Sequence, residues 1–407
     1  MRTKEISDGI KMLSMNVEDI LFEGMWELAK GVTLNSYLVQ GDKTAIIDGV
    51  IGWDGITETL YEKLEEIDVK PENINYLVIN HMEPDHSGYI QSLKSVTQDL
   101  KIICSKSASL LLDSFYDIKD DIIVVKDGDT VDLGQRKKLT FYTVPNVHWP
   151  DTMFTYEESS KTLFSCDMYG AFGIMDEHVF DDEMTLEELT FFESEGIRYY
   201  SNVMATFNSM VKKAIQKTKE LDINIIAPGH GPVYRANPTK IIDDYTRFTK
   251  YSEGYGKNEI TILWGSMYGM TAKAVRFLEK YLVKKGIKVN MLKMPQESHS
   301  EMIATVFKSA AIIIAAPTYE YKMFPPIATA LDELGRKKVS NKVAFRFGSY
   351  GWSGGAEREL SDILDRNRMK WDLVESVEFN GSPKEEDFEK IISKADILIE
   401  KMQSKII

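Results

Sequence analysis

Apolar residues occur in the first part of the chain as short runs separated by turn residues. Runs at 33–39 and 43–48 flank Gly41-Asp42, a pattern typical of a β-hairpin. Further strands are expected at 74–80, 101–104, 122–125, 139–144, 153–156, 162–166 and 223–227. Helical patterns cover 58–67, 107–115, most of 185–221 and 239–251. This mixture of hairpins and crossover helices predicts two β-sheets covered by helices.

The remainder of the chain, 259–407, alternates more regularly. Strand-like runs at 260–264, 289–292, 311–315, 343–347 and 374–379 are each followed by a helical segment. In the first of these helices an apolar stripe recurs at helical spacing, formed by Ala274, Leu278, Tyr281 and Leu282. The pattern predicts an open, doubly wound parallel sheet. The polar, glycine-containing run 252–258 is typical of a linker, so we expect domains at 1–252 and 253–407.

Length and hydropathy place the chain among globular proteins. Its 407 residues leave room for two or three domains, and 43% hydrophobic with 28% charged residues is an ordinary composition. The longest uninterrupted apolar run, 310–316, is far shorter than the roughly 20 residues that cross a bilayer. The first eight residues include acidic ones and lead into no apolar stretch, so we expect no secretory signal and a cytoplasmic protein.

Charge and cysteine content narrow the possible partners and metals. The net charge of −14 repels phosphate, which argues against nucleic acid and anionic membranes as partners. The two cysteines, Cys104 and Cys166, form no CxxC pair. Disulfide frameworks, thiolate-bound iron–sulfur clusters and zinc knuckles are therefore excluded, and any metal must take nitrogen and oxygen ligands.

Four of the six histidines lie just beyond a strand-like run. The hexapeptide His-Met-Glu-Pro-Asp-His at 81–86 directly follows the run 77–80, and three further polar residues also follow strand ends. Taken singly, each is more often an ordinary loop residue, but together they favour a metal site where the strand ends converge. The candidate ligands are His81, Glu83, Asp85, His86, His148, Asp167 and His230. His178 and His299 have no other candidate ligands near them in the sequence, and structural roles are expected for both.

The chemistry of these candidates suits two metal ions. Four imidazoles and three carboxylates, one of them bridging, satisfy two divalent ions and leave open positions. Imidazole with carboxylate suits iron and manganese as well as zinc, so ligand type alone also permits a hydrolytic dizinc site.

The hexapeptide, the later His148 and Asp167, and the run Pro-Gly-His-Gly-Pro at 228–232 resemble the metallo-β-lactamase-like domain of the flavodiiron proteins. Hydrolytic members of that fold have HxHxDH, with histidine where this chain has Glu83, and the added carboxylate favours a redox-active iron. The resemblance implies an αββα sandwich with Asp167 bridging two irons. One iron would take His81, Glu83 and His148, and the other Asp85, His86 and His230. Whether His86 binds directly is left open. Trp149, Tyr199 and Tyr200 are candidate pocket walls, although burial in the core is the more common role of such tyrosines.

Three loops of the second domain suggest a flavin site. After the strand at 260–264 comes a loop of small and hydroxyl residues that opens a helix, an arrangement that cradles phosphate, although a simple helix cap would look alike. The two later loops, at the ends of the third and fourth strands, offer aromatic rings. All three resemble flavodoxin loops, which implies FMN bound by Ser266, Met267, Tyr268, Gly269, Met270, Thr271, Pro317, Thr318, Tyr319, Glu320, Tyr321, Ser349, Tyr350, Gly351, Trp352, Ser353 and Gly354.

The whole chain thus resembles the flavodiiron proteins, in the same domain order. The resemblance implies an oxidoreductase that reduces O2 to water, or NO to N2O, at a non-haem diiron site. FMN would relay electrons from an external donor such as rubredoxin, and the protein would be a head-to-tail homodimer or a dimer of dimers. Two alternatives stay open: a dizinc hydrolase fused to an FMN domain, and an electron-transfer flavoprotein whose first domain only docks partners.

Overall fold

The computed structural model describes residues 2–18, 21–22, 24–49 and 57–407. They belong to two compact units, one within 1–200 and 207–246, the other within 201–206 and 247–407. The division falls inside helix α7 (Pro238–Ser252). The domain boundary that we predict after residue 252, where this helix ends, stays a prediction.

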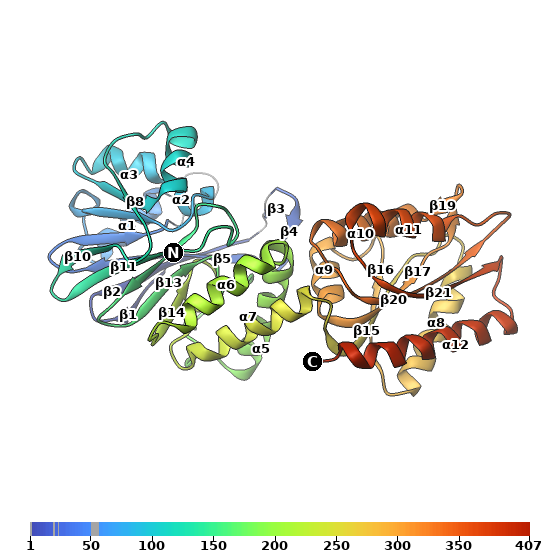
Figure 1. Ribbon diagram of the computed structural model, residues 1–407. Coiled ribbons are helices and arrows are strands. Elements are labelled where there is room, and N and C mark those ends of the chain that lie inside the picture. Colours follow the sequence, from blue (N-terminus) through green and yellow to red (C-terminus); the bar gives the residue numbers. More distant parts are fainter. Residues whose placement is uncertain (1, 19–20, 23, 50–56) are drawn as a thin grey trace. The chain divides into compact units, whose positions relative to one another are not determined.

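The first unit contains two β-sheets (Figure 1). The larger one runs in the order β1 (Arg2–Ser7), β2 (Ile10–Val17), β5 (Val32–Gln40), β6 (Thr44–Ile47), β7 (Tyr76–Ile79), β8 (Lys101–Ser105) and β9 (Ile122–Val125). It is antiparallel from β1 to β6 and parallel from β6 to β9. The smaller one runs in the order β10 (Thr130–Gly134), β11 (Lys137–Thr143), β12 (Met153–Glu157), β13 (Thr162–Cys166) and β14 (Ile225–Pro228). Only its β13–β14 pair is parallel.

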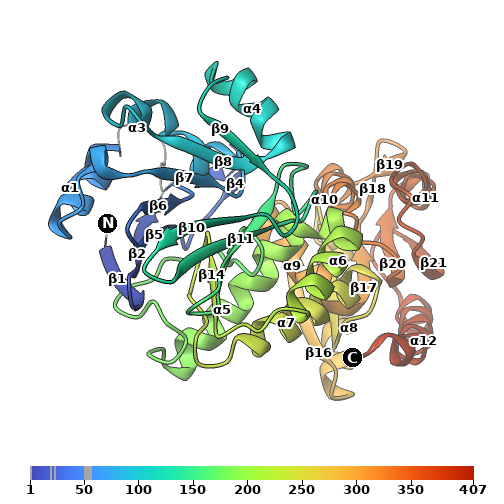
Figure 2. The ribbon, with the colours of Figure 1, turned by 60° about the vertical axis from the view of Figure 1, so that its left-hand side comes forward.

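Helices flank this sandwich on the outside (Figure 2). Beside the larger sheet lie α1 (Thr57–Glu66), the 3-10 turn Pro71–Asn73, α2 (Pro84–Ser87), α3 (Ile90–Val96) and α4 (Lys106–Tyr116). Beside the smaller sheet lie α5 (Leu186–Tyr199), α6 (Asn208–Lys219) and α7. A small hairpin of β3 (Leu21–Phe22) and β4 (Trp26–Glu27) stands apart from both sheets.

Apolar side chains from both sheets form one core. Tyr37 of β5 contacts Phe164 of β13, with ring centroids 5.1 Å apart, and both side chains are almost fully buried. Val78 and Ile103 of the larger sheet belong to the same cluster as Phe141 of the smaller one. Burial of facing apolar surface therefore holds the sheets together, and the predicted αββα architecture is confirmed.

The sequence left several elements of this unit unpredicted. β1, β2 and β10 were not expected, and the helical span 185–221 is interrupted. Between α5 and α6 the backbone forms a π-helical turn, Tyr200–Met204, and a 3-10 turn, Ala205–Phe207. The expected hairpin at 33–48 and the strands at 122–125, 153–156 and 162–166 are confirmed.

The second unit is a parallel sheet in the order β16 (Lys288–Lys293), β15 (Lys257–Trp264), β17 (Ser309–Ala315), β20 (Val343–Tyr350) and β21 (Asp372–Asn380). On one face lie α8 (Met270–Lys284) and α12 (Glu385–Met402), the latter followed by the 3-10 turn Gln403–Lys405; on the other lie α9 (His299–Lys308), α10 (Pro325–Arg336) and α11 (Ala356–Asn367) (Figure 1). Ala274, Leu278 and Leu282 are fully buried, as the stripe predicts, whereas Tyr281 is half-buried. The doubly wound sheet is confirmed. Among the described helices, none is both long and apolar enough to cross a membrane.

Candidate functional site

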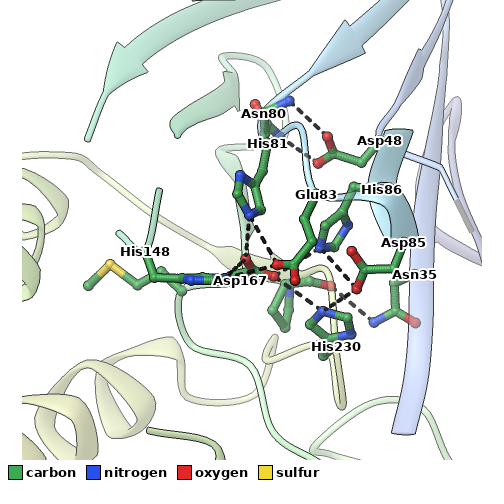
Figure 3. A network of polar contacts seen from close by, with 12 residues as sticks. Asn35, Asp48, Asn80, His81, Glu83, Asp85, His86, His148, Asp167 and His230 are labelled. Atoms are coloured by element: carbon green, nitrogen blue, oxygen red, sulfur yellow. Dashed lines mark hydrogen bonds and ion pairs between the residues drawn. The ribbon is translucent and has the colours of Figure 1, made fainter. Parts of the chain in front are cut away.

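The structure brings all seven candidate ligands of the first unit together (Figure 3). They come from four places: the loop after β7 with the short helix α2, the loop after β11, the end of β13 and the end of β14. β13 and β14 are parallel neighbours in the smaller sheet, and β7 lies in the sheet packed against them. Strand ends of the two sheets therefore deliver the ligands to one edge of the sandwich.

Asp167 stands between two groups of ligands. Its Oδ2 lies 3.4 Å from Nε2 of His81 and 3.3 Å from Nε2 of His148. Its Oδ1 lies 2.9 Å from Nε2 of His86 and 3.2 Å from Nε2 of His230. Each carboxylate oxygen thus faces a different pair of imidazoles, which is the arrangement required of a bridging ligand.

A further carboxylate completes each group. Glu83 Oε2 lies 3.3 Å from Nε2 of His81 and 3.0 Å from Nε2 of His148. Asp85 Oδ2 lies 3.5 Å from Nε2 of His230 and 3.7 Å from Nε2 of His86. Within each group the donor atoms lie within 4.8 Å of one another, so each group could hold one metal ion.

Outer hydrogen bonds orient two of the imidazoles. His81 Nδ1 lies 3.2 Å from Oδ2 of Asp151, and His230 Nδ1 lies 3.1 Å from the carbonyl oxygen of Thr33. Asn35 donates to the carbonyl oxygens on both sides of His230, at residues 228 and 231, and so fixes the end of β14. Because the outer ring nitrogen is engaged, Nε2 of each ring is directed into the site. The sequence reasoning missed Asp151, although it lies only three residues after His148.

In the metal-free protein, the charges of the site raise the pKa values of His81 and His148. Burial lowers the pKa of His81, but hydrogen bonds to Asp151 and Glu83 and the charge of Asp167 outweigh burial and raise the pKa to about 10. Burial likewise opposes a rise at His148, yet Asp167 and Glu83 raise its pKa to about 9. For Glu83, burial raises the pKa, but the two imidazoles prevail and hold it well below the usual value. The carboxylates thus attract cations, and metal ions can take the place of the protons.

A thiol lies beside the second group. Cys166 directly precedes Asp167 in the chain, and the structure also places it, buried, next to His86, which the sequence did not suggest. Burial, followed by the charge of Asp48, raises the pKa of the Cys166 thiol well above its usual value in the metal-free protein. Its sulfur forms a further group of metal-ligand type with His86 and Asp167.

Aromatic rings border the site unequally. The Trp149 ring meets the His81 ring edge-on, with centroids 5.0 Å apart. Tyr199 is fully buried, with its ring centroid 5.7 Å from that of His230. Tyr200 instead packs on Tyr245 in the core. Trp149 and Tyr199 thus border the site.

The two remaining histidines lie elsewhere. His178 Nδ1 is 3.1 Å from Oε1 of Glu188 at the start of α5, with about a third of its side chain exposed. His299 is the first residue of α9 in the second unit. In the described part of the chain neither joins a group of metal-ligand type, in line with the structural roles expected.

The three predicted flavin loops surround one cavity of the second unit, with a volume of about 410 Å3. Of the expected residues, those that line it are Met267, Tyr268, Met270, Pro317, Thr318, Tyr319, Glu320, Tyr321, Ser349, Tyr350, Gly351, Trp352 and Ser353. Ser266, Gly269, Thr271 and Gly354 do not line it, whereas Gly381, which was not predicted, does. The middle loop forms a hairpin of β18 (Thr318–Tyr319) and β19 (Lys322–Met323).

The residues that do not line the cavity shape its loops. Ser266 Oγ accepts hydrogen bonds from the backbone N–H groups of Gly269 and Ala272, at 3.1 and 3.4 Å. Gly269 has φ of 89°, a left-handed conformation that favours glycine. The buried Thr271 hydroxyl lies 2.9 Å from that of Ser349 and ties α8 to β20. These contacts hold backbone N–H groups at the start of α8 near the cavity, as a phosphate group requires.

Aromatic side chains at this cavity are exposed. Tyr268 and Trp352 are 87% and 82% exposed, and Tyr321 is 65% exposed. Exposed apolar side chains that gather around a cavity are typical of a ligand-binding or partner-binding site. The cavity, the aromatic rim and the helix start together fit a planar ring system that carries a phosphate.

Comparisons with known proteins find relatives that cover most of the chain. Residues 32–231 match the model of the ODP family beta lactamase. The chain is 32% identical over 344 residues to a nitric oxide reductase of Moorella thermoacetica, covering 84% of both proteins. It is 34% identical over 337 residues to an anaerobic nitric oxide reductase flavorubredoxin of Vibrio vulnificus, covering 81% of this chain and 66% of that protein.

Solved structures are similar over nearly the whole chain. The rubredoxin oxygen:oxidoreductase of Desulfovibrio gigas has a TM-score of 0.90 and 28% identity, and 99% of each chain is covered. A variant of the flavo-diiron protein of Thermotoga maritima has a TM-score of 0.87 and 29% identity, and 98% of each chain is covered. Both the order of the two units and the fold of each are therefore shared.

Proposed function

The chain belongs to the flavodiiron protein family and is an oxidoreductase; from that premise we propose that it reduces O2 to water, NO to N2O, or both, with electrons relayed through FMN. Two iron ions would be bound in the first unit and FMN in the cavity of the second. An external donor such as rubredoxin would supply the electrons. We expect a cytoplasmic homodimer, an expectation supported by the family resemblance.

The observation that carries the proposal is the position of Asp167. Each of its oxygens faces its own set of two histidines and one carboxylate, so one set holds His81, Glu83 and His148 and the other Asp85, His86 and His230. The position of His86 Nε2, at 2.9 Å from Asp167, supports its role as a direct ligand. All these donors are nitrogen or oxygen, and three are anionic, which suits iron that changes oxidation state.

Bound iron would supply reversible one-electron chemistry, and bound FMN would supply one- or two-electron transfer. The residues of the chain bind and orient these groups. Burial of the imidazoles and of Asp167 keeps bulk water from the centre. Trp149 and Tyr199 limit the space beside the ligands, as a site for a small gas requires.

Experiment must decide between O2 and NO as the substrate, because relatives are named for each of the two gases. The Moorella thermoacetica protein is named for nitric oxide and that of Desulfovibrio gigas for oxygen. The dizinc hydrolase receives no support, since these relatives are oxidoreductases. Glu83, in the position where hydrolytic proteins have histidine, also argues against it.

Metal and flavin contents test the proposal first. Protein purified without added metal should contain about two irons and one FMN per chain. Reduced rubredoxin should then support consumption of O2 or NO. The His81→Asn variant should lose gas reduction yet keep FMN, whereas joint substitution of Ser266 and Thr271 by alanine should lose flavin yet keep iron. Two zinc ions per chain, with no activity after iron reconstitution, would instead support the hydrolase.

A further inference from the structure

Asp151 is a fully buried carboxylate next to the metal ligands. Its Oδ2 accepts a hydrogen bond of 2.7 Å from the backbone N–H of Met82 and lies 3.2 Å from His81 Nδ1. Its own carbonyl oxygen accepts a hydrogen bond of 2.7 Å from the hydroxyl of Ser105 at the end of β8. Oδ2 is thus held against the backbone of Met82 and the ring of His81, and the backbone of Asp151 is held against the end of β8.

We propose that Asp151 is a positioning residue that holds His81 in the tautomer and orientation required for binding the first iron. An ionised carboxylate only accepts hydrogen bonds, so His81 must donate through Nδ1–H. The lone pair of the neutral ring then lies on Nε2, which faces Glu83 and Asp167. The inference rests on the proposed function, because it presumes a metal in this group.

Asp151 lies on the same loop as the candidate ligand His148 and contacts a second candidate ligand, His81. The loop that carries His148 continues through Trp149 to Asp151, and the carbonyl oxygen of Trp149 accepts hydrogen bonds from the backbone of Asn146 and the side chain of Thr152. One loop therefore provides one imidazole directly and orients another from outside. Disturbing Asp151 should affect the first group and leave the group of Asp85, His86 and His230 unchanged.

Substitution by alanine and by asparagine separates hydrogen bonding from charge. Asp151→Ala removes both bonds made by Oδ2. In Asp151→Asn the amide oxygen can occupy the Oδ2 position and accept both bonds, which places the amide nitrogen at Oδ1, an atom without a hydrogen-bond partner in the described structure. We expect the alanine variant to bind ferrous iron in the first group about 10- to 100-fold more weakly, and the asparagine variant to lose less.

Ser105→Ala is the matched control. It removes the hydrogen bond to the backbone of residue 151 and the N-cap of α4, so it loosens the same loop without touching the carboxylate. Anaerobic titration of metal-free protein with ferrous iron against a chelator measures affinity, and Mössbauer spectra distinguish the two irons. The control should bind both irons like the parent protein. In Asp151→Ala only one iron signal should change.

A spectroscopic readout tests the tautomer itself. With zinc as a diamagnetic substitute and 15N-labelled histidine, the six histidines can be followed individually. The Nδ1–H signal of His81 should be present in the parent and in Asp151→Asn and absent in Asp151→Ala. Equal affinity and unchanged signals in the alanine variant would overturn the inference, as would equal weakening of both sites. A parent protein that binds no metal pair would refute the proposed function instead.

Discussion

Metal binding by the first group should release protons and therefore depend steeply on pH. In the metal-free protein the pKa of His81 is about 10 and that of His148 about 9. Both imidazoles are protonated at pH 7, and each must lose its proton before Nε2 can bind a metal ion. Binding one ion at pH 7 should accordingly release about two protons.

The extent to which protons weaken metal binding follows from the difference between these two pKa values and the pH of the experiment. Competition with the two protons weakens binding by about 10^5-fold at pH 7 and by about 10^3-fold at pH 8. The apparent affinity should thus rise by about 100-fold per pH unit between pH 7 and 8, and should level off above about pH 10. Such steepness is far greater than for two free histidines, whose protons are mostly lost at pH 7.

Metal affinity should rise with pH, whereas the free energy of unfolding of the metal-free protein should fall with pH. The pKa of His81 in the folded state lies above the ordinary value of 6.5. The stabilisation that this shift represents is complete below pH 6.5 and is lost as the pH rises through 10. Its full size is on the order of 5 kcal/mol. The metal-loaded protein, whose imidazoles are already neutral, should lack this loss.

Zinc titration of the metal-free protein tests these expectations without redox chemistry. A competing chelator gives the affinity from pH 6.5 to 9, and an indicator dye counts released protons. Glu83→Gln provides the comparison, because it removes the carboxylate that accepts from both imidazoles and should lower the number of protons released. An affinity that is flat across this range, with no proton release, would refute the electrostatic account.

Three further substitutions probe single features. Gly229→Ala would place a methyl carbon 2.8 Å from Cε1 of His86, so the second iron should be lost and the first kept, as metal analysis with Mössbauer spectra would show. Glu378→Gln removes the charge partner of the buried Arg346, 2.6 Å away. Because Glu378 is partly exposed, the unfolding free energy should fall by about 2 kcal/mol in denaturant titration. Thr271→Val breaks a buried hydrogen bond to β20 and should weaken FMN binding about tenfold, measured by flavin fluorescence, with iron content unchanged.

The fold was largely predictable because apolar periodicity marks most elements. β15 and β17 are buried runs, and their parallel pairing follows from alternation with helices, whereas the strand order of the sheet was not predicted. β1 escaped prediction because its sequence, Arg-Thr-Lys-Glu-Ile-Ser, has one buried residue and mostly charged neighbours. The π-helical turn at 200–204 contains no glycine or proline, so only tertiary packing reveals it.

The sequence allowed the metal-ligand candidates to be predicted, because they directly follow strand ends. It did not reveal Asp151, which would act on the metal only through His81. Each metal-ligand candidate is a histidine or carboxylate beyond an apolar run, a pattern visible in the sequence. The role of Asp151 depends on its position against His81, which is 70 residues earlier in the chain. Ser266 and Thr271 were expected at the flavin, yet their hydroxyls stabilise the loops that line the cavity. Hydroxyl residues serve either purpose, and sequence alone does not separate the two.

Asp167, at the end of β13, faces both groups of ligands, and the geometry of this position suits a carboxylate. The two oxygens of Asp167 diverge from one carbon, and each reaches a different pair of imidazoles. A histidine there would offer only one free nitrogen once the other carries its proton. It would also reduce the anionic ligands from three to two and weaken the attraction for two divalent ions. Asp167 thus joins two otherwise separate groups, whereas Asp151 acts on only one of them.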